Sequence, residues 1–253
     1  MTEAKKTKQT AGKKSEIDIN PEEMNRAGLH FGHRTSKINP KMTPYLYGTR
    51  NSVHIIDLEK SAEKFKEALN FIQEIISEGK VLLMVGTKIQ AKDLLKSTAE
   101  ECGLPYVSER WLGGTFTNFE TIKKRIEYFK DLENKRKTGE LEKYTKKEKA
   151  MFDREIKGLQ TRFGGIKSLT KIPEAIFVLD MNKDILAIRE AKAKGVKVIG
   201  ISDTNVDPGL ADYVIPANDD AITSIKYVLE KVKEAILKSK PKEPKEVKET
   251  AKK

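Results

Sequence analysis

Residues 111–118, WLGGTFTN, and residues 162–169, RFGGIKSL, each contain two adjacent glycines, and a charged segment lies between them. In that segment apolar residues recur at alternating spacings of three and four, the repeat that buries one seam between two helices. The seam would consist of Phe119, Ile122, Ile126 and Phe129 in one helix and Phe152, Ile156, Leu159, Phe163 and Ile166 in the other. The spacing predicts an α-helical coiled-coil hairpin over residues 118–168.

The residues between the two runs predict where each helix ends. Thr138 and Gly139 are typical of a turn, and Thr145 followed by Glu148 is typical of a capping box at a helix start. A first helix over 118–137 would be about 30 Å long at ~1.5 Å per residue, which is longer than a crossover helix needs. We therefore predict a projecting arm whose joints are Gly113, Gly114, Gly164 and Gly165. The first pair is expected to adopt backbone conformations that are closed to other residues.

Outside the hairpin, short apolar segments alternate with amphipathic helical patterns. The strands are predicted at 53–57, 81–85, 106–107, 176–179, 196–201 and 213–215, and the longer helices at 59–77, 89–102, 184–194 and 218–237. This alternation is typical of a parallel sheet with helices on both faces. We predict an α/β body formed by residues 17–117 and 169–237. The lysine-rich tails, 1–16 and 238–253, have no periodicity and are predicted to be disordered.

The net charge of +11 is unevenly distributed along the chain. The two tails carry +3 and +4, the hairpin segment carries +6, and the predicted body carries −2. A near-neutral body with cationic arms is a layout that suits binding to a phosphate backbone at several points. The alternative is that these charges only face water, as most charge runs do.

Residues 28–51, GLHFGHRTSKINPKMTPYLYGTRN, show neither a helical nor a strand period. Cations alternate there with aromatic residues, and irregular backbone of this composition can follow phosphates and stack on exposed bases. The alternative is that the aromatic residues hold the loop to the body while the cations remain at the surface. The residues concerned are His33, Arg34, Lys37, Lys41 and Arg50 among the cations, and Phe31, Tyr45 and Tyr47 among the aromatics.

Motifs of catalysis are missing from the sequence. It contains no glycine-rich phosphate loop and no GxSxG serine motif, and its one cysteine, Cys102, has no basic neighbours that would activate it. A single cysteine also excludes an internal disulfide and suits a reducing cytoplasm. The polar N-terminal residues and the short apolar runs predict neither a signal peptide nor a membrane span. We therefore expect no enzyme activity and no cofactor.

Two groups of residues raise the question of a metal. Aspartates follow several predicted strands, and Asp180, Asp203 and Asp207, with Asp57 earlier in the chain, are candidate ligands for magnesium. The alternative, which we favour, is that they cap the next helix or order a turn. His30 and His33 form an HxxH pattern, but no second ligand pair has the spacing of a zinc site.

Five stretches resemble the S-two family of bacterial small-subunit ribosomal proteins. They cover residues 28–61, 85–91 (VGTKIQA), 109–122 (ERWLGGTFTNFETI), 172–184 (IPEAIFVLDMNKD) and 200–221. The resemblance implies a flavodoxin-like (Rossmann-like) body with a protruding coiled-coil hairpin, and the hairpin is typical of the bacterial or organellar branch. It also implies a structural, non-enzymatic role in the cytoplasmic small ribosomal subunit. Family members lie between head and body, bind small-subunit rRNA, contact neighbouring small-subunit proteins and help to recruit ribosomal protein one, which binds mRNA. No homo-oligomer is expected.

The resemblance, together with the charge pattern, gives a set of candidate rRNA contacts. Trp111 is among them, although a lone tryptophan beside two glycines can equally be a packing residue at the base of the hairpin. Two other functions remain open, namely an enzyme that uses Asp180, Asp203 and Asp207, and an adapter whose main partner is a protein. The candidate rRNA contacts are His33, Arg34, Lys37, Lys41, Arg50, Asn51, Arg110, Trp111, Lys123, Lys124, Lys135, Arg136, Lys137, Lys146 and Lys147.

Overall fold

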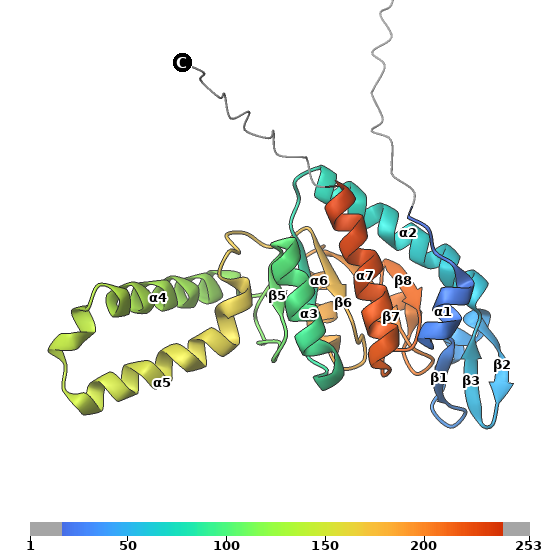
Figure 1. The fold of residues 1–253 in the computed structure, drawn as a ribbon, viewed down its shortest axis with the longest axis horizontal. Coiled ribbons are helices and arrows are strands. Elements are labelled where there is room, and N and C mark those ends of the chain that lie inside the picture. The colour runs from blue at the N-terminus through green and yellow to red at the C-terminus, as the bar shows by residue number, and fades with distance from the viewer. Residues whose placement is uncertain (1–16, 240–253) are drawn as a thin grey trace, which may run out of the picture.

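A computed structural model of the protein describes residues 17–239 and is shown in Figure 1. The predicted disordered tail at 1–16 lies outside the described residues, and so does the second tail except for Lys238 and Ser239, which belong to the last helix. Within residues 17–239, no helix combines the length and the apolar composition needed to cross a bilayer.

Five parallel strands form the central sheet, in the order β5-β4-β6-β7-β8. Every residue of β4 and of β6 is buried, which explains why both strands are continuous apolar runs in the sequence. If these five strands alone are numbered in chain order, from β4 as strand 1 to β8 as strand 5, their order in the sheet is 2-1-3-4-5. This is the flavodoxin-like order. The strands are β4 (Leu82–Val85), β5 (Tyr106–Val107), β6 (Ala175–Val178), β7 (Lys197–Ser202) and β8 (Tyr213–Pro216).

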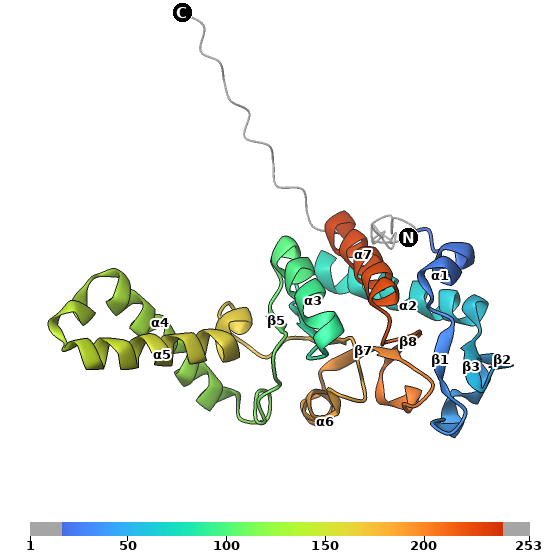
Figure 2. The same ribbon diagram turned by 60° about the horizontal axis from the view of Figure 1, so that its bottom comes forward.

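Helices cover both faces of this sheet, as the alternating pattern predicted. One face packs against α2 (Leu58–Ser77), α3 (Ile89–Cys102) and α7 (Ile222–Ser239), and their apolar residues form one core with Met84, Phe177 and Ile201 of the strands. The other face packs against α6 (Ile185–Ala193) and the base of the hairpin. Figure 2 shows α2, α3 and α7 on one side of the strands and α6 on the opposite side.

The prediction that residues 53–57 form a strand of the parallel sheet is wrong, because this strand belongs to a second, antiparallel sheet. Here β3 (Val53–Ile56) does not join the parallel sheet but lies between β1 (Phe31–Arg34) and β2 (Leu46–Arg50). Residues 28–51, which show no helical or strand period in the sequence, therefore contain the two strands β1 and β2 and the 3₁₀ helix η1 (Pro40–Tyr45). Burial alternates along β3, whereas a central parallel strand is buried throughout.

The turn between β2 and β3 explains why an asparagine stands at position 51. Asn51 and Ser52 have positive φ values, 49° and 59°, as both central residues of a type I′ hairpin turn do. Asparagine tolerates this left-handed conformation better than most residues. Asn51, a candidate rRNA contact, thus has a structural role in the tight turn of the small sheet.

The capping box predicted at residues 145–148 is confirmed and Asn20 caps another helix in a similar way, but the last helix begins at Ile222 and not at 218 as predicted. The side chain of Asn20 accepts a hydrogen bond from the backbone of Glu22 at the start of α1 (Pro21–Ala27), and Gly28 ends that helix with φ 79°. Thr145 and Glu148 form the predicted capping box at the start of α5 (Lys146–Phe163). Local hydrogen bonds determine these ends, so the sequence alone sufficed to place them.

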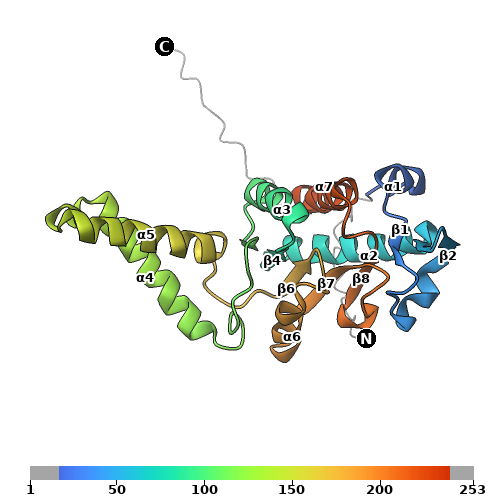
Figure 3. The ribbon, with the colours of Figure 1, turned by 90° about the horizontal axis from the view of Figure 1, so that it is seen from below.

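The hairpin segment contains the two predicted helices, α4 (Phe119–Lys137) and α5, joined through Gly139 and the 3₁₀ helix η2 (Glu140–Lys143). They extend away from the body in Figures 1 and 3. The coiled-coil geometry itself stays a prediction. The predicted seam is largely buried, at Ile122, Ile126, Phe129, Ile156, Leu159, Phe163 and Ile166.

The four glycine joints differ from one another. Gly114 has φ 91°, which favours glycine, but Gly113 does not have a positive φ, and a Cβ added there would meet only Leu186 at 3.9 Å. The prediction of a restricted conformation is therefore wrong for Gly113. Gly164 starts the 3₁₀ helix η3 (Gly164–Ile166). A Cβ on Gly165 would come within 2.2 Å of the backbone oxygen of Tyr106 in β5.

We expect Gly165→Ala to destabilise the protein by about 1–3 kcal/mol, because overpacking against a backbone oxygen forces the hairpin base away from β5. Gly113→Ala is the matched control and should change the free energy of unfolding by less than about 0.5 kcal/mol. Urea denaturation followed by circular dichroism measures both variants. Equal effects of the two substitutions would contradict this account of the joints.

Candidate functional site

A cluster of charged side chains lies where the strands of the parallel sheet end. The loops that follow β4, β6, β7 and β8 contribute Lys88, Asp180, Asp203 and the pair Asp219 and Asp220. Because the carboxyl ends of parallel strands share one edge of a sheet, these residues meet although they are far apart in sequence. His33 of β1 joins them from the small antiparallel sheet. We call these six residues the sheet-edge cluster.

Lys88 lies in the middle of the carboxylates. Its Nζ atom is 2.6 Å from Asp220, 2.8 Å from Asp219 and 3.2 Å from Asp180. Burial opposes its charge, but hydrogen bonds to Asp219 and Asp220 outweigh burial and raise the pKa of Lys88. Burial first, and then the like charges of Asp180 and Asp203, raise the pKa of Asp219 to about 7. Asp219 therefore takes up a proton more readily than an ordinary aspartate does.

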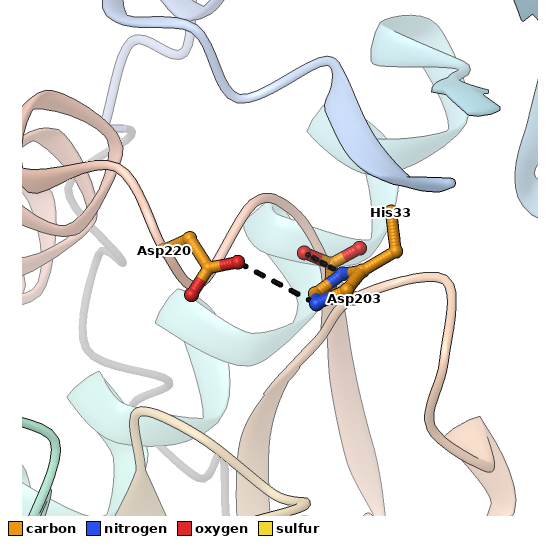
Figure 4. Close-up of side chains that lie close together, drawn as sticks. All are labelled: His33, Asp203 and Asp220. Atoms are coloured by element: carbon orange, nitrogen blue, oxygen red, sulfur yellow. Dashed lines mark ion pairs between the residues drawn. The ribbon is translucent and has the colours of Figure 1, made fainter. Parts of the chain in front are cut away.

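His33 links the two sheets. Its Nδ1 atom is 3.1 Å from Asp203 and its Nε2 atom is 3.5 Å from Asp220. Figure 4 shows the imidazole ring paired with both carboxylates. Its backbone N–H donates to the hydroxyl of Thr204 at 2.9 Å. The hydrogen bond to Asp203, despite an opposing contribution from burial, raises the pKa of His33. The side chain is only 20% exposed, so this candidate rRNA contact is already engaged within the protein.

Among residues 17–239, His33, Asp203 and Asp220 are also the group whose ligand atoms lie close enough to hold a metal ion. The two carboxylates, however, contact different nitrogens of one imidazole, and Lys88 brings a positive charge to Asp220. This arrangement fits a protonated histidine between two carboxylates better than a metal, which would use one ring nitrogen and would be repelled by the ammonium group.

The aspartates considered as magnesium ligands are occupied by local hydrogen bonds. Asp57 caps α2, and Asp180 accepts from the backbone of Asn182 and Lys183 at 2.9 Å. Asp207 caps the 3₁₀ helix η4 (Pro208–Leu210) and pairs with Lys41 at 2.5 Å. In the described part of the chain, Asp180, Asp203 and Asp207 do not form a common ligand group. The capping interpretation is the one that their geometry supports.

Glu190 of α6 is a buried carboxylate that sequence reasoning missed. It accepts hydrogen bonds from the indole Nε1 of Trp111 at 3.2 Å and from the backbone N–H groups of Gly114 at 2.8 Å, Phe116 at 2.9 Å and Thr117 at 3.2 Å. Burial opposes its ionisation, but the backbone donors outweigh burial and lower the pKa of Glu190. Trp111 is 5% exposed and packs edge-on against Phe116, so it is a packing residue at the hairpin base.

The candidate rRNA contacts do not form one patch. Arg34 and Arg50 belong to the small sheet and Lys37 to the loop after β1, at one end of the molecule, and the hairpin extends from the opposite end in Figure 1. Arg110 is exposed beside the hairpin base. On the hairpin, Lys135 pairs with Asp131 at 2.7 Å and Arg136 with Asp153 at 3.4 Å. In the part of the chain that the structure describes, Lys123, Lys124, Lys137, Lys146 and Lys147 make no ion pair.

Three exposed hairpin arginines, Arg125, Arg154 and Arg162, were missed by the sequence analysis. The signal was available in the spacing, because Arg154, Gly158 and Arg162 recur every four residues and so share one side of α5.

We expect the stability contributed by His33 to depend on pH. Since its pKa is raised in the folded state, the contribution is fully present below about pH 6.5 and is lost as the pH rises through the folded-state value. His33→Gln should therefore destabilise the protein more at about pH 5.5 than at about pH 8.5. Urea denaturation at both pH values measures this, and an equal loss at both would show that the imidazole charge is not used.

We expect Glu190→Gln to destabilise the protein by about 1–3 kcal/mol, because an amide NH₂ would face backbone N–H donors that are left without an acceptor. The fluorescence of Trp111, the single tryptophan, should shift to the red as its environment loosens. Glu234→Gln, which removes only an exposed pair with Lys238, is the control and should have an effect below about 1 kcal/mol. Unchanged stability and fluorescence in Glu190→Gln would contradict the view that this carboxylate stabilises the hairpin base.

Comparison with known proteins shows the family of the chain. The family model described as Ribosomal protein S2 matches residues 24–239. A protein of Roseiflexus sp. (strain RS-1) named small ribosomal subunit protein uS2 is 47% identical over 211 residues, which are 83% of this chain and 80% of the relative. The protein of the same name from Koribacter versatilis (strain Ellin345) is 43% identical over 219 residues, 87% of this chain and 73% of the relative. Both are named as ribosomal proteins and neither as an enzyme, and the chain belongs to the ribosomal protein S2 family of the small ribosomal subunit.

Proposed function

We propose that this structural component of the small subunit binds rRNA at two separate basic surfaces, with the α/β body as a spacer between them. One surface is on the small sheet, at Arg34, Lys37 and Arg50. The other is on the hairpin, at Lys123, Lys124, Lys137, Lys146 and Lys147. The observation that carries the proposal is the separation of charge, since cations that have no carboxylate partner within residues 17–239 lie at both ends of a body that has a slightly negative net charge.

The two surfaces should contribute in different ways. Exposed lysines on a helix act as point charges towards phosphates and give affinity without reading sequence. The small sheet adds Tyr47, which is 83% exposed and belongs to the same strand as Arg50. Aromatic and guanidinium planes can stack on unpaired bases, so this surface is suited to recognising RNA shape. If the hairpin helices form a coiled coil in the subunit, the arm would hold its lysines at a constant distance from the body.

We further propose a position between the head and the body of the subunit and support for docking of ribosomal protein one and neighbouring subunit proteins. Two exposed apolar residues support a protein contact. Ile89 and Ile222, 77% and 57% exposed, are the first residues of α3 and α7, which both start at the sheet edge that holds the charged cluster. Exposed apolar side chains at one edge favour association with another protein.

Co-sedimentation with small subunits at rising salt tests the RNA contacts. One variant replaces Lys137 of the hairpin surface and its neighbours Lys135 and Arg136 by Ala, and the other replaces Arg34, Lys37 and Arg50 by Ala. Both should release the protein at lower salt. For every phosphate that a variant no longer neutralises, the slope of log affinity against log salt should fall by about 0.7–0.9. The first triple variant should show the smaller change, because two of its residues already pair with carboxylates on the hairpin.

The control variant removes three cations from the body, Arg26, Lys66 and Lys194, which the structure describes as exposed. It should keep the salt slope of the unmodified protein. The same slope in all three variants would contradict rRNA binding through the two surfaces.

A further inference from the structure

A hollow of about 330 Å³ lies between α4 and α5 near the base of the hairpin. Arg125 of α4 and Arg154 and Arg162 of α5 line it. Within residues 17–239 none of these three guanidinium groups makes an ion pair or a hydrogen bond, in contrast to Arg136, which pairs with Asp153. The hollow thus has three cations whose hydrogen-bonding groups remain available.

Gly158 helps to form the hollow. Glycine inside a helix is unfavourable relative to alanine, so its presence in the middle of α5 needs a reason. A Cβ added at Gly158 would lie 3.5 Å from the Nη2 atom of Arg162, which shows that this guanidinium lies over the glycine. Leu159 and Phe163, which are buried in the helix pair, add apolar atoms to the lining. The result is an apolar recess with guanidinium groups around it.

A second hollow, of about 210 Å³, lies where the hairpin meets α3 and β5, and Arg162 lines both. Its lining includes Lys96 and Arg110, together with Tyr106 and Gly165. Since Arg162 belongs to both hollows, they form one basic track from the hairpin to the body. We call this track the arginine groove, and its cations are Arg125, Arg154, Arg162, Arg110 and Lys96.

Three acidic residues also line the groove, and two of them have partners. The hydroxyl of Tyr128 donates to Glu155 at 3.1 Å, and Lys92 is 3.5 Å from Glu109. Asp93 is the third. Five cations against three carboxylates leave the groove with a positive net charge, which favours an anionic ligand.

We propose that the arginine groove binds single-stranded RNA, with phosphates held by Arg154, Arg162 and Arg110 and one unstacked nucleotide in the hollow between α4 and α5. Guanidinium groups suit this ligand because they bind phosphate in a bidentate manner and also stack on bases. A recess of this size admits a small ligand such as a nucleotide but not the rigid width of a duplex. The inference rests on the proposed rRNA-binding function and names the residues and the RNA form for one part of the hairpin.

The first test measures binding of a fluorescently labelled single-stranded RNA to the full-length chain by anisotropy. Arg154→Ala and Arg162→Ala should each weaken binding about tenfold, which corresponds to about 1.4 kcal/mol. Arg162→Lys should restore only part of the affinity, because lysine keeps the charge but loses the planar fork. Arg26→Ala on α1, at the opposite end of the molecule, is the charge-matched control and should bind as the unmodified chain does. Unchanged affinity of both groove variants would overturn the inference.

A second variant changes the shape and not the charge. Gly158→Leu should fill the recess and weaken RNA binding several-fold, whereas Gly158→Ala, whose Cβ has only an ordinary contact with Arg162, should bind normally. Circular dichroism confirms that both variants keep their helices. Normal binding by Gly158→Leu would exclude a nucleotide from the hollow.

Two competition measurements establish the class of ligand. The same RNA annealed to its complement should bind at least several-fold more weakly, and equal binding would overturn the single-stranded specificity. A polyglutamate peptide at equal charge concentration should compete poorly. Competition equal to that of RNA would show that the groove accepts any polyanion, an acidic peptide included.

Failure of this inference can be distinguished from failure of the proposed function. If the groove variants bind RNA normally but the triple variants of the small sheet and hairpin lose their salt-dependent retention on subunits, only the arginine groove is wrong. If no variant changes retention on subunits, the proposed function fails as well.

Discussion

The carboxylate of Glu190 is the interaction on which the placement of the hairpin depends. It lies on α6, inside the core on one face of the sheet, and accepts hydrogen bonds from the segment that leads into α4. An ionised side chain that is 6% exposed is tolerated only because several donors point at it. The direction in which the chain leaves the body is therefore set by hydrogen bonds to one residue. Where the chain returns from α5 to the body, Gly165 allows it to approach β5 closely.

Whether a charged side chain has a partner of opposite charge depends on its position in the fold. Inside the body, Lys88 and His33 each contact two or more carboxylates, so that the sheet edge is balanced internally and the small sheet is linked to the parallel one. Among residues 17–239, cations without such partners are found on the small sheet and the hairpin and also, more scattered, on the body, as at Arg26 and Lys194. The proposed binding through two distant surfaces would make the affinity the product of many weak contacts, which would suit a component of the small ribosomal subunit.

Features governed by neighbours in sequence were predicted well. The capping box at Thr145 and the ends of α4 follow from local hydrogen bonds and from the helical spacing of apolar residues. The parallel sheet followed from apolar runs such as β4, because a strand buried on both faces has no alternation. The strand β3 was assigned to the wrong sheet, since its composition permits either sheet and its partners β1 and β2 were hidden in a stretch rich in glycine and proline.

By itself, the sequence determined the α/β class, the two helices of the hairpin segment, most helix ends and the basic composition of that segment, because each depends on composition or on residues a few positions apart. Only the tertiary structure decided which charges are neutralised. His33 and Asp203 are 170 positions apart, and so no local pattern could show that this candidate RNA contact is an internal link. No local pattern could show the hydrogen bond between Trp111 and Glu190 either, or that three arginines lie around Gly158. Packing between distant segments determines which side chains stay free to bind a partner.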